Sequence, residues 1–192
     1  MFGFGKDPLA VGAEAPTLSV TTHTGETLDL GSSYAEGPVL VYFYPKAFTP
    51  GCTAQACNLR DEFADLAAEG ITVLGVSRDS VEKQAEFRAE YNLPFTLIAD
   101  TGNELGKAFG VGSMMGVVHK RQSFLVVDGK VAWRDLSATP ASQAQDLLAA
   151  YAALSAPLGK PRVHVIRWRS GICLILEMGR RTLHRTSEVA NP

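Results

Sequence analysis

Residues 38–57 read PVLVYFYPKAFTPGCTAQAC, and this stretch decides the fold. Its first seven residues, 38–44, form an unbroken apolar run, which is typical of a central strand buried on both faces. Thr49 can act as the N-cap of a helix, and Pro50 suits the first helical turn. The stretch therefore predicts a buried strand that leads directly into a helix, with Cys52 near the start of that helix.

On either side of this junction, strand patterns and helix patterns alternate along the chain. The helix after Thr49 is expected to end at Gly70, because apolar residues recur at helical spacing up to that glycine. Asp128 and Gly129 predict the tight turn of a hairpin. The other predicted elements are strands at 17–22, 27–30, 71–77, 95–99, 122–127 and 130–134, helices at 80–91, 103–109 and 141–154, and a loop at 110–120. This alternation predicts a layered α/β fold, with a largely parallel sheet that is flanked by helices and carries an antiparallel edge.

Charge divides the 192 residues into two parts. Residues 1–159 carry 11 Lys and Arg against 18 Asp and Glu, whereas residues 160–192 carry 7 against 2. We expect an α/β domain over residues 1–156 and a short basic extension over residues 157–192. The acidic domain has no basic surface for nucleic acid, and the cluster of arginines in the extension is too short to suggest one.

The extension is the part whose role the sequence leaves open. The segments RVHVIRWR at 162–169 and CLILEM at 173–178 predict two short strands joined by a turn at 169–171. One interpretation is a loosely packed or disordered basic tail without a selected function. The other is a small β-appendage that docks on the acidic domain.

Targeting and membrane signals are not apparent in the sequence. No apolar run approaches the roughly 18 residues that cross a bilayer. The N-terminal residues contain no apolar stretch long enough for a signal peptide. We therefore expect a cytoplasmic protein that does not act at a membrane. Its three cysteines are too few for a disulfide scaffold, and in a reducing compartment they are reactive, metal-binding or inert.

Cys52 is the first candidate for chemistry. The N–H groups in the first turn of a helix have no intrahelical partner and carry a positive potential. That position favours the thiolate, which is the nucleophilic form of cysteine. The alternative interpretation is a small buried residue that happens to begin a helix.

Cys57 follows Cys52 at a spacing that differs from the Cys-x2-Cys of thioredoxin-like redox motifs and zinc knuckles. On one α-helix the two Cα atoms would lie about 8.6 Å apart, and a disulfide needs less than about 7 Å. Either the two thiols are unrelated, or the first turns of the helix unwind when they bond. Zinc is disfavoured, because it takes about four ligands and no histidine or further cysteine lies nearby in the sequence.

The same stretch resembles the active-site signature of the peroxiredoxins, Pro-x-x-x-Thr-x-x-Cys, at Pro45, Thr49 and Cys52. The second cysteine, Cys57, is similar to that of the Q-type, or bacterioferritin-comigratory-protein, subgroup.

Two further segments agree with this resemblance. VGAEAPTLSV at residues 11–20 is similar to the opening strand of the family, and RQSFLVVDGKV at 121–131 resembles a later strand that begins with an arginine. The resemblance covers roughly residues 10–154 in matching order.

The resemblance implies a thioredoxin-like fold and an enzyme that reduces hydroperoxides without metal, haem or any other cofactor. Cys52 would be the peroxidatic thiolate, and Arg121 would stabilise it and polarise the peroxide. Thr49 would hydrogen-bond a peroxide oxygen or the thiolate, while Pro45 would shield the sulfur from water. Cys57 would be the resolving thiol.

The resemblance also implies the partners of the reaction. Cys57 would form an intramolecular disulfide with Cys52, and thioredoxin or a similar dithiol donor would reduce that disulfide. Because both thiols belong to one chain, we expect a monomer. Gln55 occupies a position where the family often has Glu or Gln, and it would help to orient Arg121.

Other residues receive plainer predictions. Cys173 is expected to be inert and buried, with a backup resolving role as the alternative. His23 and His119 are expected at the surface or in loops. Met114 and Met115 are expected to pack without a special role, the alternative being an apolar rim around the pocket.

Two rival functions remain open at this point. One is a thiol–disulfide oxidoreductase or redox sensor on the same fold, which the absent Cys-x2-Cys motif disfavours. The other is a binding module with inert thiols.

Overall fold

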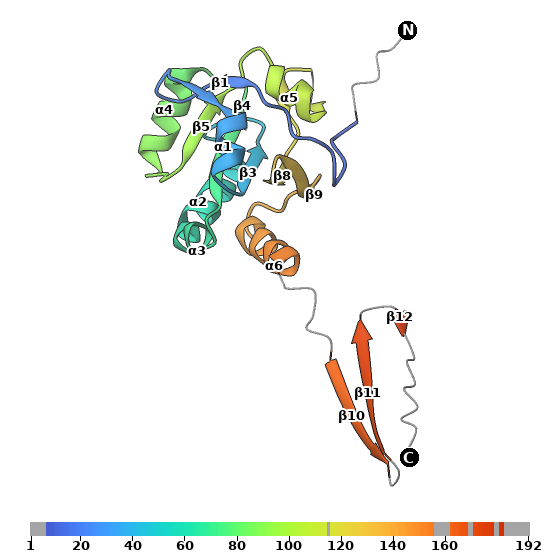
Figure 1. Cartoon of the computed structure of the whole chain (residues 1–192). Helices are drawn as coiled ribbons and strands as arrows, with labels where there is room; N and C mark the ends of the chain where they lie inside the picture. The colour runs from blue at the N-terminus through green and yellow to red at the C-terminus, as the bar shows by residue number, and fades with distance from the viewer. Residues whose placement is uncertain (1–6, 115, 156–161, 169–170, 179–180, 183–192) are drawn as a thin grey trace. The chain divides into compact units, whose positions relative to one another are not determined.

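The computed structural model describes residues 7–114, 116–155, 162–168, 171–178 and 181–182 (Figure 1). The chain divides into two compact units, Met1–Tyr151 and Ala152–Pro192. The predicted boundary after residue 156 stays a prediction. Within the described residues, no helix combines the length and the apolar character needed to span a bilayer.

A five-stranded mixed sheet forms the centre of the first unit. It consists of β3 (Val39–Phe43), β4 (Thr72–Ser77), β5 (Thr96–Ala99), β8 (Gln122–Val127) and β9 (Lys130–Asp135). The strand order is β5-β4-β3-β8-β9; β3, β4 and β5 are parallel, while β8 is antiparallel to both β3 and β9. The predicted parallel sheet with an antiparallel hairpin edge is therefore present.

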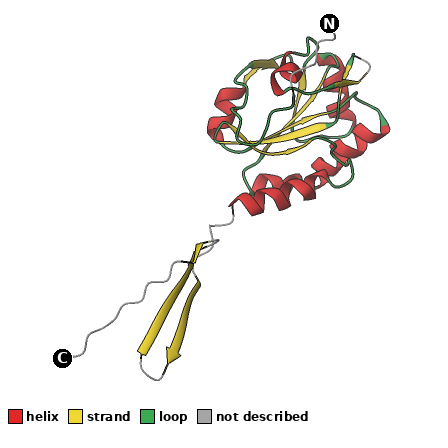
Figure 2. Ribbon diagram, turned by 90° about the vertical axis from the view of Figure 1, so that its right-hand side faces the viewer, coloured by secondary structure: helices red, strands yellow, loops and turns green. Residues whose placement is uncertain are grey.

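Helices cover both faces of this sheet (Figure 2). One face packs against residues of α2 (Pro50–Asp61), α3 (Phe63–Ala68), α4 (Val81–Glu90) and α6 (Gln143–Ser155), and the other against residues of α1 (Leu30–Glu36) and α5 (Glu104–Phe109). All five residues of β3 are buried, and they alternate between the two cores. This double burial explains why the strand reads as a continuous apolar run.

The structure corrects the predicted long helix after Thr49. The helix ends at Asp61, and a second helix, α3, begins at Phe63. Glu62 stands between them with φ −97° and ψ 10°, and its N–H bonds the Asn58 carbonyl at 3.2 Å. The apolar spacing continues across the break, which is why the pattern alone suggested one helix.

Three short elements depart from the predictions. α1 begins at Leu30, where only a strand was expected, and Asp29 caps it by accepting a hydrogen bond from the Ser32 N–H at 2.7 Å. The predicted loop at 110–120 contains a small antiparallel ribbon of β6 (Ser113–Met114) and β7 (Val118–His119). A second small ribbon pairs β1 (Ser19–Thr21) with β2 (Thr27–Asp29), close to the predicted strands.

The second unit contains the strands predicted in the extension. β10 (Arg162–Trp168) pairs antiparallel with β11 (Gly171–Met178), which pairs in turn with β12 (Arg181–Thr182). Two residues of the predicted turn, 169 and 170, lie outside the described residues. Cys173 belongs to β11, and the prediction for its thiol stays a prediction.

Candidate active site

Cys52 is the third residue of α2, at the point where the buried strand β3 leads into the helix. Thr49 precedes the helix in an extended conformation, and Pro50 is the first helical residue. The Thr53 N–H bonds the Thr49 carbonyl at 2.9 Å, so the N–H groups of Gly51 and Cys52 precede the first turn of hydrogen bonds. Cys52 is 1% exposed. The sulfur therefore lies at the positive end of a helix and largely away from bulk water.

Arg121 supplies the second positive group at this position. Its Nη2 donates a hydrogen bond to Cys52 Sγ at 3.4 Å. Arg121 directly precedes β8, and its neighbour Gln122 pairs with Phe43 at the end of β3. The antiparallel pairing of β8 with β3 thus brings together two residues that are far apart in the sequence.

Gly51 allows the guanidinium to approach the helix closely. A Cβ atom at this glycine would lie 3.1 Å from Arg121 Nη2, a contact that would force the arginine to shift. A side chain at this position would therefore displace the guanidinium by a few tenths of an ångström.

Arg121 is held by a buried chain of amide side chains. Its Nη1 donates a hydrogen bond to Gln55 Oε1, and Gln55 Nε2 donates one to Gln143 Oε1. Gln143 Nε2 then donates one to Ser123 Oγ. Gln55, Gln143 and Ser123 are fully buried, so each of these polar groups needs its partner.

Thr49 and Pro45 lie in the loop that precedes the helix. Thr49 Oγ1 donates a hydrogen bond to the Lys46 carbonyl at 2.9 Å, so its side chain does not cap α2. Pro45 is half-buried.

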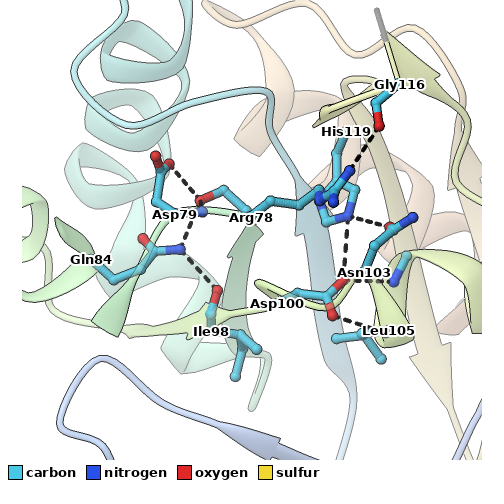
Figure 3. Close-up of polar contacts among 11 residues, drawn as sticks. Arg78, Asp79, Gln84, Ile98, Asp100, Asn103, Leu105, Gly116 and His119 are labelled. Atoms are coloured by element: carbon cyan, nitrogen blue, oxygen red, sulfur yellow. Dashed lines mark hydrogen bonds and ion pairs between the residues drawn. The ribbon is translucent and has the colours of Figure 1, made fainter. Parts of the chain in front are cut away.

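A network behind this loop holds it in place. Asp79 Oδ2 accepts hydrogen bonds from the Ala47 N–H at 2.8 Å and from Ser77 Oγ at 2.7 Å. Gln84 Nε2 donates to Ser77 Oγ at 2.9 Å and to the Ile98 carbonyl at 2.8 Å (Figure 3). The loop that carries Pro45 and Thr49 is therefore anchored to the ends of β4 and β5.

Tyr44 joins the same network from the end of β3. Its hydroxyl donates to Gln84 Oε1. Burial raises the pKa of Tyr44 well above its ordinary value, so the hydroxyl keeps its proton and remains a donor.

Phe48 packs against aromatic residues at α4 and just after it. Its backbone has φ +63°, and its ring packs against Phe87 and Tyr91. The Lys83 ammonium lies 4.4 Å from the ring centroid. Phe48 therefore fixes the loop against α4.

Cys57 lies in the same helix as Cys52 and is half-buried; both thiols are free. Because α2 is continuous from Pro50 to Asp61, the helical spacing of about 8.6 Å between their Cα atoms applies. A disulfide between the two cysteines requires this helix to unwind locally.

The expectation of a surface or loop position for His119 is wrong. This residue is fully buried, and its Nε2 lies 2.9 Å from Asn103 Oδ1 and 3.3 Å from Asp100 Oδ2 (Figure 3). Asp100 also accepts hydrogen bonds from the N–H groups of Leu105 and Gly106, at 3.1 and 2.8 Å. Sequence patterns missed this cluster because its partners lie on different elements.

His23, by contrast, lies half-buried in a turn, as predicted. Its Nδ1 accepts a hydrogen bond from the Leu97 N–H at 3.4 Å. Burial, and next the charge of Arg88, lower the pKa of His23.

A cavity of about 290 Å³ adjoins Arg121; it is lined by Met114, Lys120, Arg121, Leu136, Ser137 and Ala138. Met114 is 47% exposed, so the expectation that it simply packs into the fold is wrong. It belongs to the small β6–β7 ribbon, which the sequence did not indicate. Met115 lies outside the described residues.

Sequence reasoning missed two members of the polar chain, Gln143 and Ser123. Ser123 stands two residues after Arg121, which directly precedes β8, and alternate residues of an extended chain face the same side. The two-residue spacing from Arg121 could therefore have identified Ser123 as a neighbour of the site. Gln143 carries no such signal, because only the packing of α6 against α2 brings it to the site.

The sequence pattern of the AhpC/TSA family matches residues 11–134. The chain belongs to this family. Peroxiredoxin Bcp of Escherichia coli K12 is 43% identical over 132 residues, which cover 65% of this chain and 84% of that protein. The putative peroxiredoxin bcp of Coxiella burnetii is 44% identical over 103 residues, which cover 54% of this chain and 68% of that protein.

Solved structures give the same result. Peroxidoxin BcpB of Mycobacterium tuberculosis superimposes with a TM-score of 0.72 at 29% identity, covering 79% of this chain and 100% of that one. A peroxiredoxin Q structure from Xanthomonas campestris gives 0.68 at 32% identity, covering 74% and 97%. The predicted thioredoxin-like peroxiredoxin fold and the predicted family are confirmed. The protein is a peroxiredoxin of the AhpC/TSA family, a peroxidase that works through cysteine chemistry.

Proposed function

We propose that Cys52 is the peroxidatic residue and that it reduces hydrogen peroxide and organic hydroperoxides. The hydrogen bond of 3.4 Å from Arg121 Nη2 to Cys52 Sγ is the observation that carries this proposal. The thiolate sulfur attacks one peroxide oxygen, the O–O bond breaks, and water or an alcohol leaves after taking up a proton. Cys52 is then a sulfenic acid.

Arg121 supports this step in two ways. Its permanent charge favours the thiolate, and its N–H groups can stabilise the negative charge that develops on the leaving oxygen. The free N–H groups at the start of α2 add to the same potential. Thr49 Oγ1, which donates to the Lys46 carbonyl, can still accept a hydrogen bond from the peroxide. Pro45 and the burial of Cys52 limit access of water to the sulfur.

Cys57 then resolves the sulfenic acid. Its thiolate attacks Cys52 Sγ, an S–S bond forms and the S–O bond breaks; the departing hydroxide takes up a proton from solvent and leaves as water. This step requires the first turns of α2 to unwind, because the intact helix holds the two Cα atoms too far apart. A thioredoxin-like dithiol then reduces the disulfide by thiol–disulfide exchange. We infer that the cycle runs within one chain, in a cytoplasmic monomer.

The proposal is tested by peroxide consumption with a thioredoxin couple. We expect Cys52→Ser to abolish turnover, because it removes the sulfur to which Arg121 donates a hydrogen bond. Cys57→Ser should still be oxidised once at Cys52, with the sulfenic acid trapped by a dimedone probe, but should recycle poorly. Cys173→Ser is the matched control and should turn over like the wild type. Full peroxidase activity in Cys52→Ser would contradict the assignment.

A further inference from the structure

Two buried glutamines connect Arg121 to the rest of the protein. A guanidinium can only donate hydrogen bonds, so Gln55 must present its Oε1 to Arg121 and its Nε2 to Gln143. Gln143 must in turn present its Oε1 to Gln55 and its Nε2 to Ser123. Each amide therefore has one defined orientation.

The chain of hydrogen bonds runs from Arg121 through two helices and ends at Ser123, two residues after Arg121. Arg121 directly precedes β8 and Ser123 is its second residue, Gln55 belongs to α2, and Gln143 is the first residue of α6. Both glutamines are fully buried, so no water is available to replace a lost partner. Removing Gln143 would leave Gln55 with an unpartnered amide beside the arginine.

Gln55 also lies between the two cysteines. Any unwinding of α2 that brings Cys57 to Cys52 must move Gln55, and so it must break the hydrogen bonds from Gln55 to Gln143 and from Arg121 to Gln55. The chain therefore exists only while the helix is folded.

We propose that Gln143 is a positioning residue that, through Gln55, both holds Arg121 against Cys52 and holds the first turns of α2 folded. This inference rests on the proposed function. It predicts opposite effects on two steps: Gln143 favours the attack of Cys52 on peroxide and opposes the resolution of Cys52 by Cys57.

A second contact between α6 and α2 supplies a matched control. Asn58 Oδ1 accepts from the Ala144 N–H at 2.9 Å, Asn58 Nδ2 donates to Gln145 Oε1 at 3.2 Å, and Gln145 Nε2 donates to Glu62 Oε1 at 2.9 Å. These bonds lie beyond Cys57 and do not reach Arg121; the two made by the Gln145 side chain are exposed, and the one from the Ala144 N–H is part-buried. They hold the part of α2 that follows Cys57 against α6. The segment between the two cysteines contacts α6 through the hydrogen bond between Gln55 and Gln143.

The experiment compares Gln143→Leu with Gln145→Leu in the full-length protein. Reduced enzyme is mixed with hydrogen peroxide, quenched at short times with an alkylating reagent, and analysed by mass spectrometry for thiol, sulfenic acid and disulfide. We expect Gln143→Leu to slow the oxidation of Cys52 by about tenfold, the factor that corresponds to the loss of roughly one hydrogen bond. Disulfide formation should become several-fold faster. Gln145→Leu should match the wild type in both steps.

Ser123→Ala is the second variant, in case Gln143→Leu folds poorly. It removes only the last acceptor of the chain and should change both steps in the same directions by a smaller factor. The inference is overturned if the wild type is active but the Gln143 and Ser123 variants leave both rates unchanged or slow both steps. If peroxide does not oxidise Cys52 in the wild type, the proposed function itself fails, and this outcome is distinct from the first.

Discussion

Two buried polar networks lie on opposite faces of the sheet, and they start from residues only two positions apart. On one face Arg121 links Cys52 to a chain of amides; on the other, His119 joins Asp100 and Asn103. His119 also packs edge-on against Phe43, whose ring belongs to the core on that second face.

The difference lies in where each network ends. The Asp100 cluster holds α5, because its carboxylate accepts from two backbone N–H groups at the start of that helix as well as lying beside His119. The Arg121 network ends on a thiol that can be oxidised. Burial of polar groups therefore does not by itself mark an active site; a set of donors directed at a nucleophile does.

The largest difference between the two networks is expected when the arginine that donates to Cys52 is removed. Arg121→Met should lower the rate of Cys52 oxidation by roughly 10²–10³-fold, the usual effect of losing a donor to a developing oxyanion. Stopped-flow peroxide kinetics measure this. Arg134→Met is the control, because Arg134 donates instead to the carbonyls of Pro8 and Leu9. Equal losses in the two variants would show that Arg121 has no special role.

A smaller change tests the spacing between the helix and the arginine. Gly51→Ala places a Cβ atom where it would lie 3.1 Å from Arg121 Nη2. We expect the oxidation rate to fall by roughly tenfold, since small misplacements of catalytic groups are costly. Stability should rise by less than the roughly 1 kcal/mol that separates alanine from glycine in a helix interior, because Gly51 lies in the first turn of α2. Urea unfolding and peroxide kinetics on the same samples separate these effects, and an unchanged rate would refute the close-approach argument.

The smallest effect on activity is expected from a substitution in the cluster of His119, Asp100 and Asn103. His119→Leu removes the Nε2 donor of Asn103 Oδ1 and the ring beside Asp100 Oδ2, whereas Asp100 keeps its hydrogen bonds from the Leu105 and Gly106 N–H groups; the loss should cost about 1 kcal/mol of unfolding free energy. The oxidation rate should remain near the wild-type value, because the cluster does not contact Cys52. Urea denaturation followed by circular dichroism gives the stability. A loss of rate as large as that of Arg121→Met would show that the two networks act as one.

The parts that the sequence predicted well were local. The buried strand, the helix start and the position of Cys52 follow from apolar runs and from Pro50, whose effects act over a few residues. The predictions failed where burial or helix length depends on contacts between residues far apart in the sequence. Residue type alone could not show that His119 is buried, because its partners, Asp100 and Asn103, lie in the connection between β5 and α5. The break at Glu62 and the exposure of Met114 likewise depend on how neighbouring elements pack.

By itself, the sequence determined that a cysteine stands at the first turn of a helix after a buried strand, because backbone geometry and hydrophobic periodicity are local properties. Only the tertiary structure decided which groups surround that cysteine. The pairing of β8 with β3 brings Arg121 to Cys52, and the packing of α6 on α2 brings Gln143 to Gln55. Hydrogen bonds between residues 66 and 88 positions apart in the chain form only after the whole domain has closed around them.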